Sequence, residues 1–190
     1  MKAVQVNNGI VTVENVSEPR GEGITVDVSS VGICGSDLHL IDSGMMSVTP
    51  GHEIAGVTRD GTPVAIEPML SCGECNHCLE GEEPYCPDAL PNTFGIGIDG
   101  GMAERIVVPE RFLIPLRPRV KVEEAFLVEP LAVAVRSLGR VGVSEGDRVC
   151  VIGAGTIGLC CVAVAKYLGA TVELESRHSH QLEAGSRLGA

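Results

Sequence analysis

Four cysteines lie within fifteen residues of this chain, and their spacing limits what the segment around them can form. They are Cys72, Cys75, Cys78 and Cys86. Residues 67–101 are rich in glycine, proline, cysteine and acidic side chains, which predicts loops rather than part of an apolar core. Four thiolates so close together in such a loop are typical of a closed, tetrahedral structural zinc site. The alternative is a pair of disulfides or scattered free thiols, and a reducing compartment disfavours the disulfides.

The composition indicates a globular protein that binds a small molecule. Hydrophobic residues make up 44% of the chain but aromatic residues only 3%, so the core is expected to be aliphatic. The formal net charge of −11 argues against binding to nucleic acid, which requires a basic face. The N-terminus has no signal pattern, and the longest apolar stretch, 149–165, contains three glycines. We therefore expect a cytoplasmic protein with no membrane association.

Alternating apolar and polar residues predict β structure in the first part of the chain. Asn7, Asn8 and Gly9 separate the alternating runs 3–6 and 10–13, which is the pattern of a β-hairpin. Further strands are expected at 24–30, 54–57, 64–66, 102–108 and 112–116. This part of the chain is therefore predicted to form a β-rich domain.

The pattern changes near residue 122. Residues 122–139 predict a helix that Pro130 kinks or divides. The elements expected after it are a strand at 147–152, a glycine turn at 153–158, a helix at 159–168, a strand at 171–175 and a helix at 179–190. This order is that of the opening unit of a parallel nucleotide-binding sheet. Because such a sheet has about six strands, the chain is expected to be a fragment of a longer polypeptide.

A glycine motif joins the first strand of that unit to its helix. It consists of Gly153, Ala154, Gly155, Thr156, Ile157 and Gly158. A motif of this kind between a hydrophobic strand and a helix is typical of a dinucleotide-binding loop, in which the glycines permit a tight turn and the close approach of a pyrophosphate. The alternative is a plain glycine-rich turn between a strand and a helix.

A second group of metal-ligating residue types lies outside the cysteine cluster. Cys34 offers a thiolate, while His52 and Glu53 offer an imidazole and an adjacent carboxylate. Three protein ligands with one open position are characteristic of catalytic zinc. Glu129 stands among apolar residues, so a metal or a hydrogen-bond partner is expected for its carboxylate. Taken singly, His52 is also consistent with a core histidine and Cys34 with a residue in a turn.

Several motifs together resemble those of the zinc-dependent medium-chain alcohol dehydrogenases, over nearly the whole chain. The cysteine cluster has the spacing found in that family, residues 34–39 resemble its Cys-x-Ser/Thr-Asp-x-His motif, and residues 51–53 resemble its Gly-His-Glu signature. Residues 99–104 and 128–132 resemble the polyol and threonine dehydrogenase branch, in which a glutamate, here Glu129, precedes the proline in place of a cysteine.

The resemblance implies roles for the residues that carry it. Three residues are expected to hold a catalytic zinc ion, namely Cys34, His52 and Glu53. Glu129 is expected to bind that zinc or a water on it, and the four cysteines of the cluster are expected to hold a structural zinc. Ser36 is expected to take the hydroxyl proton of the substrate, and His39 to pass it towards solvent.

The fold implied by the resemblance is mixed α/β. A GroES-like, β-rich catalytic domain at 1–135 precedes the start of a truncated Rossmann dinucleotide-binding domain at 136–190, with the active site between them. The implied activity is hydride transfer between a secondary alcohol or its ketone (polyol, amino alcohol or sugar-like) and NAD(P) in a homo-oligomer. The fragment alone is expected to be inactive. The alternatives are a zinc-free quinone reductase, against which the cysteines argue, and a non-catalytic, zinc-binding structural or regulatory protein.

The cofactor preference depends on the end of the second strand of the nucleotide-binding unit. An acidic residue there usually binds the ribose 2′-hydroxyl of NAD. The residue expected at that position is Ser176, followed by Arg177, and a small hydroxyl beside a guanidinium suits the 2′-phosphate of NADP. Glu175 lies one residue earlier, and a shift of one residue would favour NAD instead. We therefore expect NADP rather than NAD.

Overall fold

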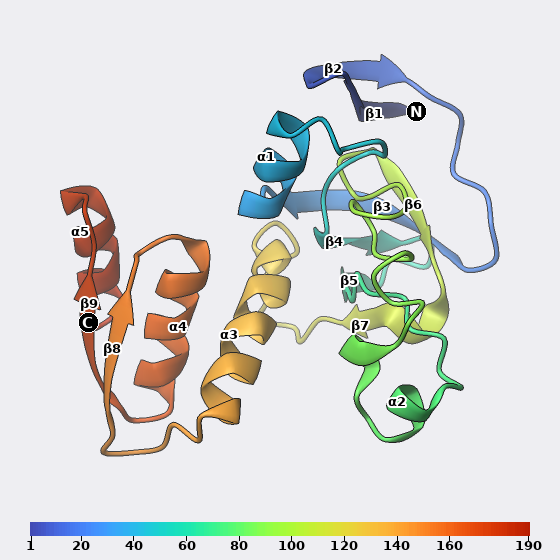
Figure 1. Cartoon of the computed structure of the whole chain (residues 1–190). Helices are drawn as coiled ribbons and strands as arrows, with labels where there is room; N and C mark the ends of the chain where they lie inside the picture. The colour runs from blue at the N-terminus through green and yellow to red at the C-terminus, as the bar shows by residue number, and fades with distance from the viewer. The chain divides into compact units, whose positions relative to one another are not determined.

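The computed structural model describes all residues from Met1 to Ala190, and the chain forms two compact units. The first, Met1–Glu129, is rich in β-strands, and the second, Pro130–Ala190, alternates strands with helices (Figure 1). The expected domain boundary at 135 lies six residues after this break, and the assignment of separate roles to the two domains stays a prediction. None of the helices is both long enough and apolar enough to cross a bilayer.

A five-stranded antiparallel sheet forms the centre of the first unit. In spatial order its strands are β6 (Arg105–Val108), β3 (Ile24–Gly32), β4 (Glu53–Thr58), β5 (Pro63–Ile66) and β7 (Leu113–Pro115). The alternation in the sequence places Val26, Ile54 and Val108 in a core where each is at most 1% exposed. Because burying a side chain of this size contributes about 1.5–3 kcal/mol, these positions hold the strands in register.

The predicted hairpin is confirmed. β1 (Lys2–Asn7) and β2 (Ile10–Asn15) pair antiparallel, and the two residues between them, Asn8 and Gly9, have φ angles of 52° and 76°. Two consecutive residues with positive φ are required by a type I′ turn, and asparagine and glycine adopt this conformation at little cost. A hydrogen bond from Val4 N to Met102 O (2.8 Å) joins the hairpin to the segment before β6.

A short helix that the sequence pattern did not predict carries two of the expected site residues. This helix, α1 (Gly35–Asp42), contains Ser36 and His39. The Asp37 carboxylate accepts a hydrogen bond from Cys34 N at 2.9 Å, which satisfies a backbone donor at the start of the helix. The helix escapes prediction because it has only eight residues and begins after a cysteine instead of one of the usual capping residues.

Two expectations about helices are wrong in detail. Pro130 neither kinks nor divides a helix over 122–139, because α3 (Val128–Arg140) begins only two residues before it, and the first turn of a helix does not need the missing N–H of proline. The glycine turn is shorter than expected, since α4 (Thr156–Tyr167) already begins at Thr156. The remaining short helices of the first unit are α2 (Asn76–Leu79) and the 3-10 turns η1 (Glu83–Tyr85), η2 (Glu110–Phe112) and η3 (Ala125–Leu127).

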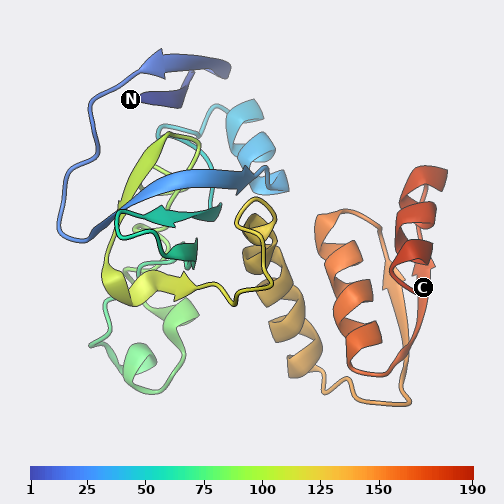
Figure 2. The ribbon, with the colours of Figure 1, turned by 180° about the vertical axis from the view of Figure 1, so that it is seen from behind.

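The second unit contains the predicted strand–helix–strand arrangement. β8 (Arg148–Ile152) pairs in parallel with β9 (Thr171–Glu175), and α4 packs against both strands, as the two opposite views in Figures 1 and 2 show. α5 (Ser179–Arg187) follows β9. Val162, Ala165 and Val172 form the buried core of this unit. The parallel pairing confirms the βαβ order inferred from the sequence.

Candidate metal centres and cofactor loop

The four clustered cysteines converge at one point. Their Sγ atoms all lie within 4.8 Å of one another. The Sγ atoms are 3.5 Å apart in Cys75–Cys78, 3.5 Å in Cys72–Cys86 and 3.9 Å in Cys72–Cys78. A tetrahedron with zinc–sulfur bonds of about 2.3 Å has sulfur–sulfur edges of about 3.8 Å, whereas a disulfide bond measures about 2.05 Å. The cluster therefore has the dimensions of a tetrahedral zinc site, and all eight cysteines are free of disulfides.

The thiols of this cluster differ in their affinity for protons. Backbone N–H groups of Glu74 and Cys75 lower the pKa of Cys72 to about 7. The N–H of Cys78 lowers the pKa of Cys75, but burial and the neighbouring thiols outweigh it and raise that pKa to about 12. A divalent cation replaces such shared protons because thiolates are its ligands. The donor set therefore fits zinc.

The second predicted group of ligands is also assembled. Ligand atoms of Cys34, His52 and Glu53 lie within 4.8 Å of one another. Cys34 follows β3, and Glu53 opens β4 directly opposite Gly32 in the sheet register. A Cβ atom at Gly32 would lie 1.8 Å from Oε2 of Glu53, so the glycine leaves the space that this carboxylate occupies. The pairing of β3 with β4 thus brings ligands from two strand ends together.

A buried aspartate lies behind the histidine of this group. Asp37 is 1% exposed, and its Oδ1 lies 3.5 Å from Nδ1 of His52, which is 6% exposed. Neither of these two atoms has a hydrogen-bond partner with good geometry. Burial lowers the pKa of His52, but the side chains of Asp37 and Cys34 outweigh it and raise that pKa to about 9. For Glu53 burial has the opposite effect and raises the pKa, because it disfavours the charged carboxylate. This concentration of buried acceptors favours a cation, and it fits zinc.

Glu129 lies close to the group without belonging to its innermost set. It occupies the first turn of α3 and is half-buried. Burial raises its pKa, the nearby His52 lowers it, and the nearby Glu53 raises it. Its carboxylate is not among the ligand atoms within 4.8 Å of one another. The structure therefore gathers three of the four predicted ligands, and the role of Glu129 stays a prediction.

Ser36 and His39 lie on one face of α1, three residues apart. The Oγ atom of Ser36 is 3.5 Å from Nε2 of His52, so this hydroxyl borders the predicted metal site. His39 is exposed, one helical turn farther on. Ser36 therefore lies beside the predicted metal site and His39 at the surface, and their part in a proton relay stays a prediction.

The glycine loop of the second unit has the geometry of a dinucleotide-binding turn. Gly153 has a φ of 99°, which few other residues adopt. A Cβ atom at Gly155 would meet nothing within 4 Å, so the backbone there is open to a ligand. A Cβ atom at Gly158 would lie 1.8 Å from the carbonyl oxygen of Gly153, so only glycine lets the helix pack this closely. These are the three functions of glycine in the fingerprint, and the loop fits a bound pyrophosphate.

The residues expected to select the cofactor follow β9. Glu175 is the last residue of that strand and is exposed. Ser176 comes next, and its Oγ donates a hydrogen bond to Oε1 of Gln181 at 2.5 Å. Arg177 is exposed. The structure thus places a hydroxyl and a guanidinium immediately after the strand.

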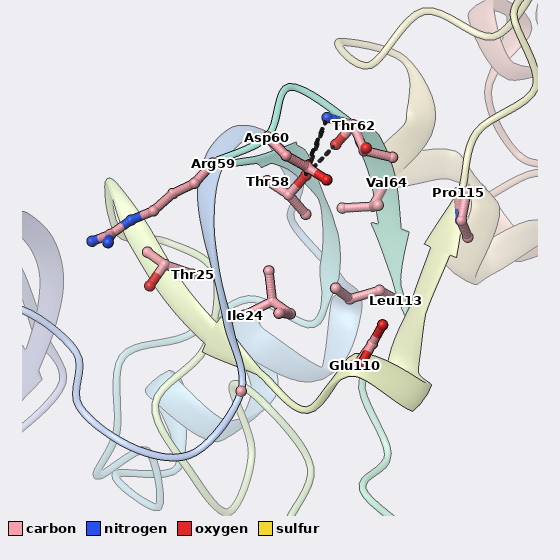
Figure 3. A pocket seen from close by; sticks show the side chains of 11 residues that line it. Ile24, Thr25, Thr58, Arg59, Asp60, Thr62, Val64, Glu110, Leu113 and Pro115 are labelled. Atoms are coloured by element: carbon pink, nitrogen blue, oxygen red, sulfur yellow. Dashed lines mark hydrogen bonds between the residues drawn. The ribbon is translucent and has the colours of Figure 1, made fainter.

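A separate cavity of about 620 Å³ lies at the ends of strands β3, β4, β5 and β7 (Figure 3). Thr58 donates a hydrogen bond to Asp60, and the N–H of Thr62 donates to both. The guanidinium of Arg59 points away from the other labelled side chains. No cysteine or histidine lines the cavity. Because Thr58, Asp60 and Thr62 bond to each other and no metal-ligating thiol or imidazole is present, the cavity offers little of the chemistry found in the two clusters above.

The chain is similar to known proteins of one family over the segment that contains both groups of metal-ligating side chains. Residues 20–118 match the alcohol dehydrogenase GroES-like domain. The chain is 31% identical to sorbitol dehydrogenase of Bacillus subtilis, over 99% of the chain and 59% of that enzyme. Galactitol-1-phosphate dehydrogenase of Escherichia coli has a similar structure, with 33% identity and a TM-score of 0.91, covering 100% of this chain and 60% of that one. A zinc-binding dehydrogenase of Sinorhizobium meliloti bound to NADP has 32% identity, a TM-score of 0.90 and the same coverage.

These likenesses confirm the mixed α/β fold with a GroES-like domain. The chain spans about 60% of the length of each of the three relatives named above. The matched domain covers more than half of the chain and contains both clusters of metal-ligating side chains. The chain therefore belongs to the zinc-dependent medium-chain alcohol dehydrogenase family, in the branch of the polyol dehydrogenases.

Proposed function

We propose that this chain is part of a zinc-dependent oxidoreductase that transfers a hydride between a secondary alcohol and a nicotinamide cofactor. The observation that carries the proposal is the group of half-buried Cys34 with buried His52 and Glu53, whose ligand atoms lie within 4.8 Å of one another. Relatives named sorbitol dehydrogenase and galactitol-1-phosphate dehydrogenase support a polyol or sugar-like substrate. The same relatives do not favour a non-catalytic zinc protein.

The catalytic site depends on side chains that hold a cation and orient it. Cys34, His52 and Glu53 are the protein ligands, and Asp37 fixes the ring of His52 from behind. When bound, zinc supplies a Lewis acid for the substrate oxygen and the nicotinamide exchanges a hydride with the adjacent carbon. Glu129, whose carboxyl pKa responds to the charges of His52 and Glu53, binds the zinc or a water on it.

Alcohol oxidation also releases a proton, and α1 provides a path for it. The Oγ of Ser36 receives the hydroxyl proton of the substrate and passes its own proton towards His39. The imidazole of His39, which is exposed, delivers the proton to water. The alternative is that His39 is an ordinary surface residue.

The second unit supplies the cofactor-binding loop, and we propose NADP as the preferred cofactor. Gly153, Gly155 and Gly158 form the pyrophosphate-binding turn, together with the Thr156 and Ile157 backbone at the start of α4. Ser176 and Arg177 follow the second strand, where a guanidinium can bind a 2′-phosphate. Solved relatives bind either cofactor, NADP in the protein from Sinorhizobium meliloti and NADH in one from Escherichia coli, so the proposed preference rests on Ser176 and Arg177.

The proposal also includes a structural zinc site, a cytoplasmic location and assembly into a homo-oligomer. Cys72, Cys75, Cys78 and Cys86 hold a second zinc ion that stabilises the fold, because all four positions around it are filled by thiolates. The protein acts in the cytoplasm as a homo-oligomer. Eight cysteines without a disulfide support a reducing compartment.

Metal analysis of cysteine variants tests the two sites. The chain is expected to hold two zinc equivalents. Cys34→Ser is expected to lose one with little change in melting, whereas Cys75→Ser loses the other and melts at lower temperature. Cys150→Ser is the matched control, since Cys150 is exposed and lies outside both groups. A single equivalent in the fully loaded parent chain would contradict the assignment.

Turnover tests the reaction itself. The complete gene product, loaded with zinc, is expected to reduce NADP in the presence of a panel of polyols, and Cys34→Ser is expected to abolish this. Turnover of quinones without zinc would instead favour the quinone reductase alternative. Full turnover by Cys34→Ser would refute the proposed catalytic site.

A further inference from the structure

The loop that contains the four cysteines has no lysine or arginine to balance its negative charge, and its one histidine, His77, lies 3.7 Å from a carboxylate of the same loop, Glu82. We define the cysteine loop as residues 71–92, and the chain contains no lysine or arginine between Arg59 and Arg105. Its acidic residues are Glu74, Glu80, Glu82, Glu83 and Asp88. Four thiolates around one divalent cation add a further net charge of 4 × (−1) + 2 = −2, by the ligand chemistry of such sites. A cation from outside the loop is needed to offset this charge.

Arg111 is the basic side chain that contacts the loop from outside. It belongs to η2, which precedes β7, and its Nη2 donates a hydrogen bond to the carbonyl oxygen of Ser71. Ser71 is 6% exposed and directly precedes the first cysteine of the cluster. The guanidinium carbon of Arg111 lies 4.6 Å from the centroid of the Phe112 ring. The cation is therefore held between an aromatic ring and the loop backbone.

The loop leaves space for this guanidinium. Gly73 has a φ of 81°, and a Cβ atom there would lie 2.3 Å from Nη1 of Arg111. Any side chain at that position would push the guanidinium away from the loop. The glycine between the first two cysteines therefore serves two purposes, a turn of the backbone and the close approach of Arg111.

One peptide group connects Arg111 to a metal-binding sulfur. The carbonyl oxygen of that peptide belongs to Ser71 and accepts the hydrogen bond from Arg111. Its N–H belongs to Cys72 and donates to Sγ of Cys86 at 3.3 Å. A charged donor on the carbonyl polarises the amide and strengthens the hydrogen bond that the N–H gives to sulfur. The positive charge of Arg111 is thus transmitted to the Cys86 thiolate.

We propose that Arg111 is a positioning residue of the four-thiolate metal site, where it compensates charge and slows the loss of the metal. The inference rests on the proposed structural zinc site. It assigns to η2, a turn outside the cysteine loop, a part in retaining the metal. A purely mechanical role, in which Arg111 only ties the loop to Phe112, makes a different prediction for a lysine at this position.

Release of cobalt from the loaded chain tests the inference. In a Cys34→Ser background, thiolate-to-cobalt absorption comes from the four cysteines alone, and its decay in excess chelator gives the rate of release. Because Arg111→Gln removes both the positive charge and a charge-assisted hydrogen bond, it is expected to accelerate release by about tenfold. Arg111→Lys keeps the charge and is expected to remain within about threefold of the parent rate. Arg119→Gln, which removes an exposed positive charge later in the chain, is expected to change nothing.

The outcomes distinguish the proposed role of Arg111 from the existence of the four-cysteine metal site. Equal release rates for Arg111→Gln and the parent would overturn the inference while leaving the metal site intact. Equal acceleration by Arg111→Gln and Arg111→Lys would also overturn it, because charge would then not be the cause. Absence of thiolate-to-cobalt absorption in the parent would refute the structural metal site itself. Circular dichroism and melting of each loaded variant separate these effects from a failure to fold.

Discussion

Asp37 controls the protonation of His52 in the metal-free protein, and replacing it gives a sharp test of the candidate catalytic site. The pKa of His52 rises from 6.5 to about 9, against the effect of burial, because Asp37 and Cys34 lie beside the ring. Since the folded pKa lies above the ordinary value, the protonated ring stabilises folding fully below pH 6.5. This contribution is lost as the pH rises through about 9.

The expected magnitude follows from the shift. A rise of about 2.5 pKa units at 1.36 kcal/mol per unit corresponds to about 3 kcal/mol in the free energy of unfolding. Asp37 contributes the largest of the effects that raise the pKa, ahead of Cys34. Asp37→Asn is therefore expected to remove about 2 kcal/mol at pH 6 and progressively less towards pH 9. Burial of the asparagine amide in Asp37→Asn also changes the free energy of unfolding, by an amount that is the same at every pH.

Urea denaturation of the chelated, reduced chain at several pH values between 6 and 9 measures this difference. Asp42→Asn is the matched control, because Asp42 ends the same helix and is exposed. The zinc-loaded forms of the parent and Asp37→Asn are expected to run parallel with pH, since coordination by His52 excludes the proton. If the free energies of unfolding of the metal-free parent and of metal-free Asp37→Asn differed by the same amount at every pH, this reasoning would be refuted.

Three further changes test other parts of the site. Gly158→Ala places a Cβ atom 1.8 Å from the Gly153 carbonyl, so we expect a loss of about 1–3 kcal/mol in urea denaturation, with Gly139→Ala, where a Cβ meets nothing, as control. His39→Gln is expected to lower alcohol oxidation about tenfold near pH 7 and less at high pH, where hydroxide accepts the proton directly; an unchanged pH–rate profile would exclude the relay. Arg177→Ala is expected to reduce kcat/KM for NADP about tenfold and to leave kcat/KM for NAD unchanged. If the variant had the same kcat/KM for NADP as the parent, the 2′-phosphate contact would be excluded.

The sequence alone predicts those elements whose structure depends on a few neighbouring residues. Asn8 and Gly9 predict the hairpin because a type I′ turn demands two residues with positive φ. Alternation predicts β3, whose Val26 is buried between the exposed Asp27 and the half-buried Thr25, whereas β4 is a short apolar run that is buried on both faces. The three glycines of the nucleotide-binding loop are identifiable because each is required for a different steric reason.

Contacts between distant segments explain what the sequence did not reveal. The partner of His52 is Asp37, fifteen residues earlier, and only the folding of α1 against β4 brings the two together. Arg111 reaches Ser71 across forty residues, and no spacing rule connects them. The closeness of Glu129 to the metal ligands also depends on where α3 begins. Long-range packing thus determines the surroundings of residues that motifs identify singly.

The choice between NADP and NAD illustrates why a single residue of register matters. Glu175 pairs with Ile152 inside the sheet, and its exposed position alternates with buried Val172 and half-buried Leu174, so it shares the outer face of β9 with Glu173. The N–H of Gly153 donates to the carbonyl of Glu175 at 2.8 Å, which places the next residue, Ser176, at the level of the glycine loop. Successive residues of a strand face opposite sides, but Ser176 lies just beyond the end of β9, so this alternation does not extend to it. At the level of the glycine loop the chain therefore presents the Glu175 carboxylate, then a hydroxyl and then a guanidinium, and kcat/KM of the Arg177→Ala variant with NADP and with NAD decides between the two cofactors.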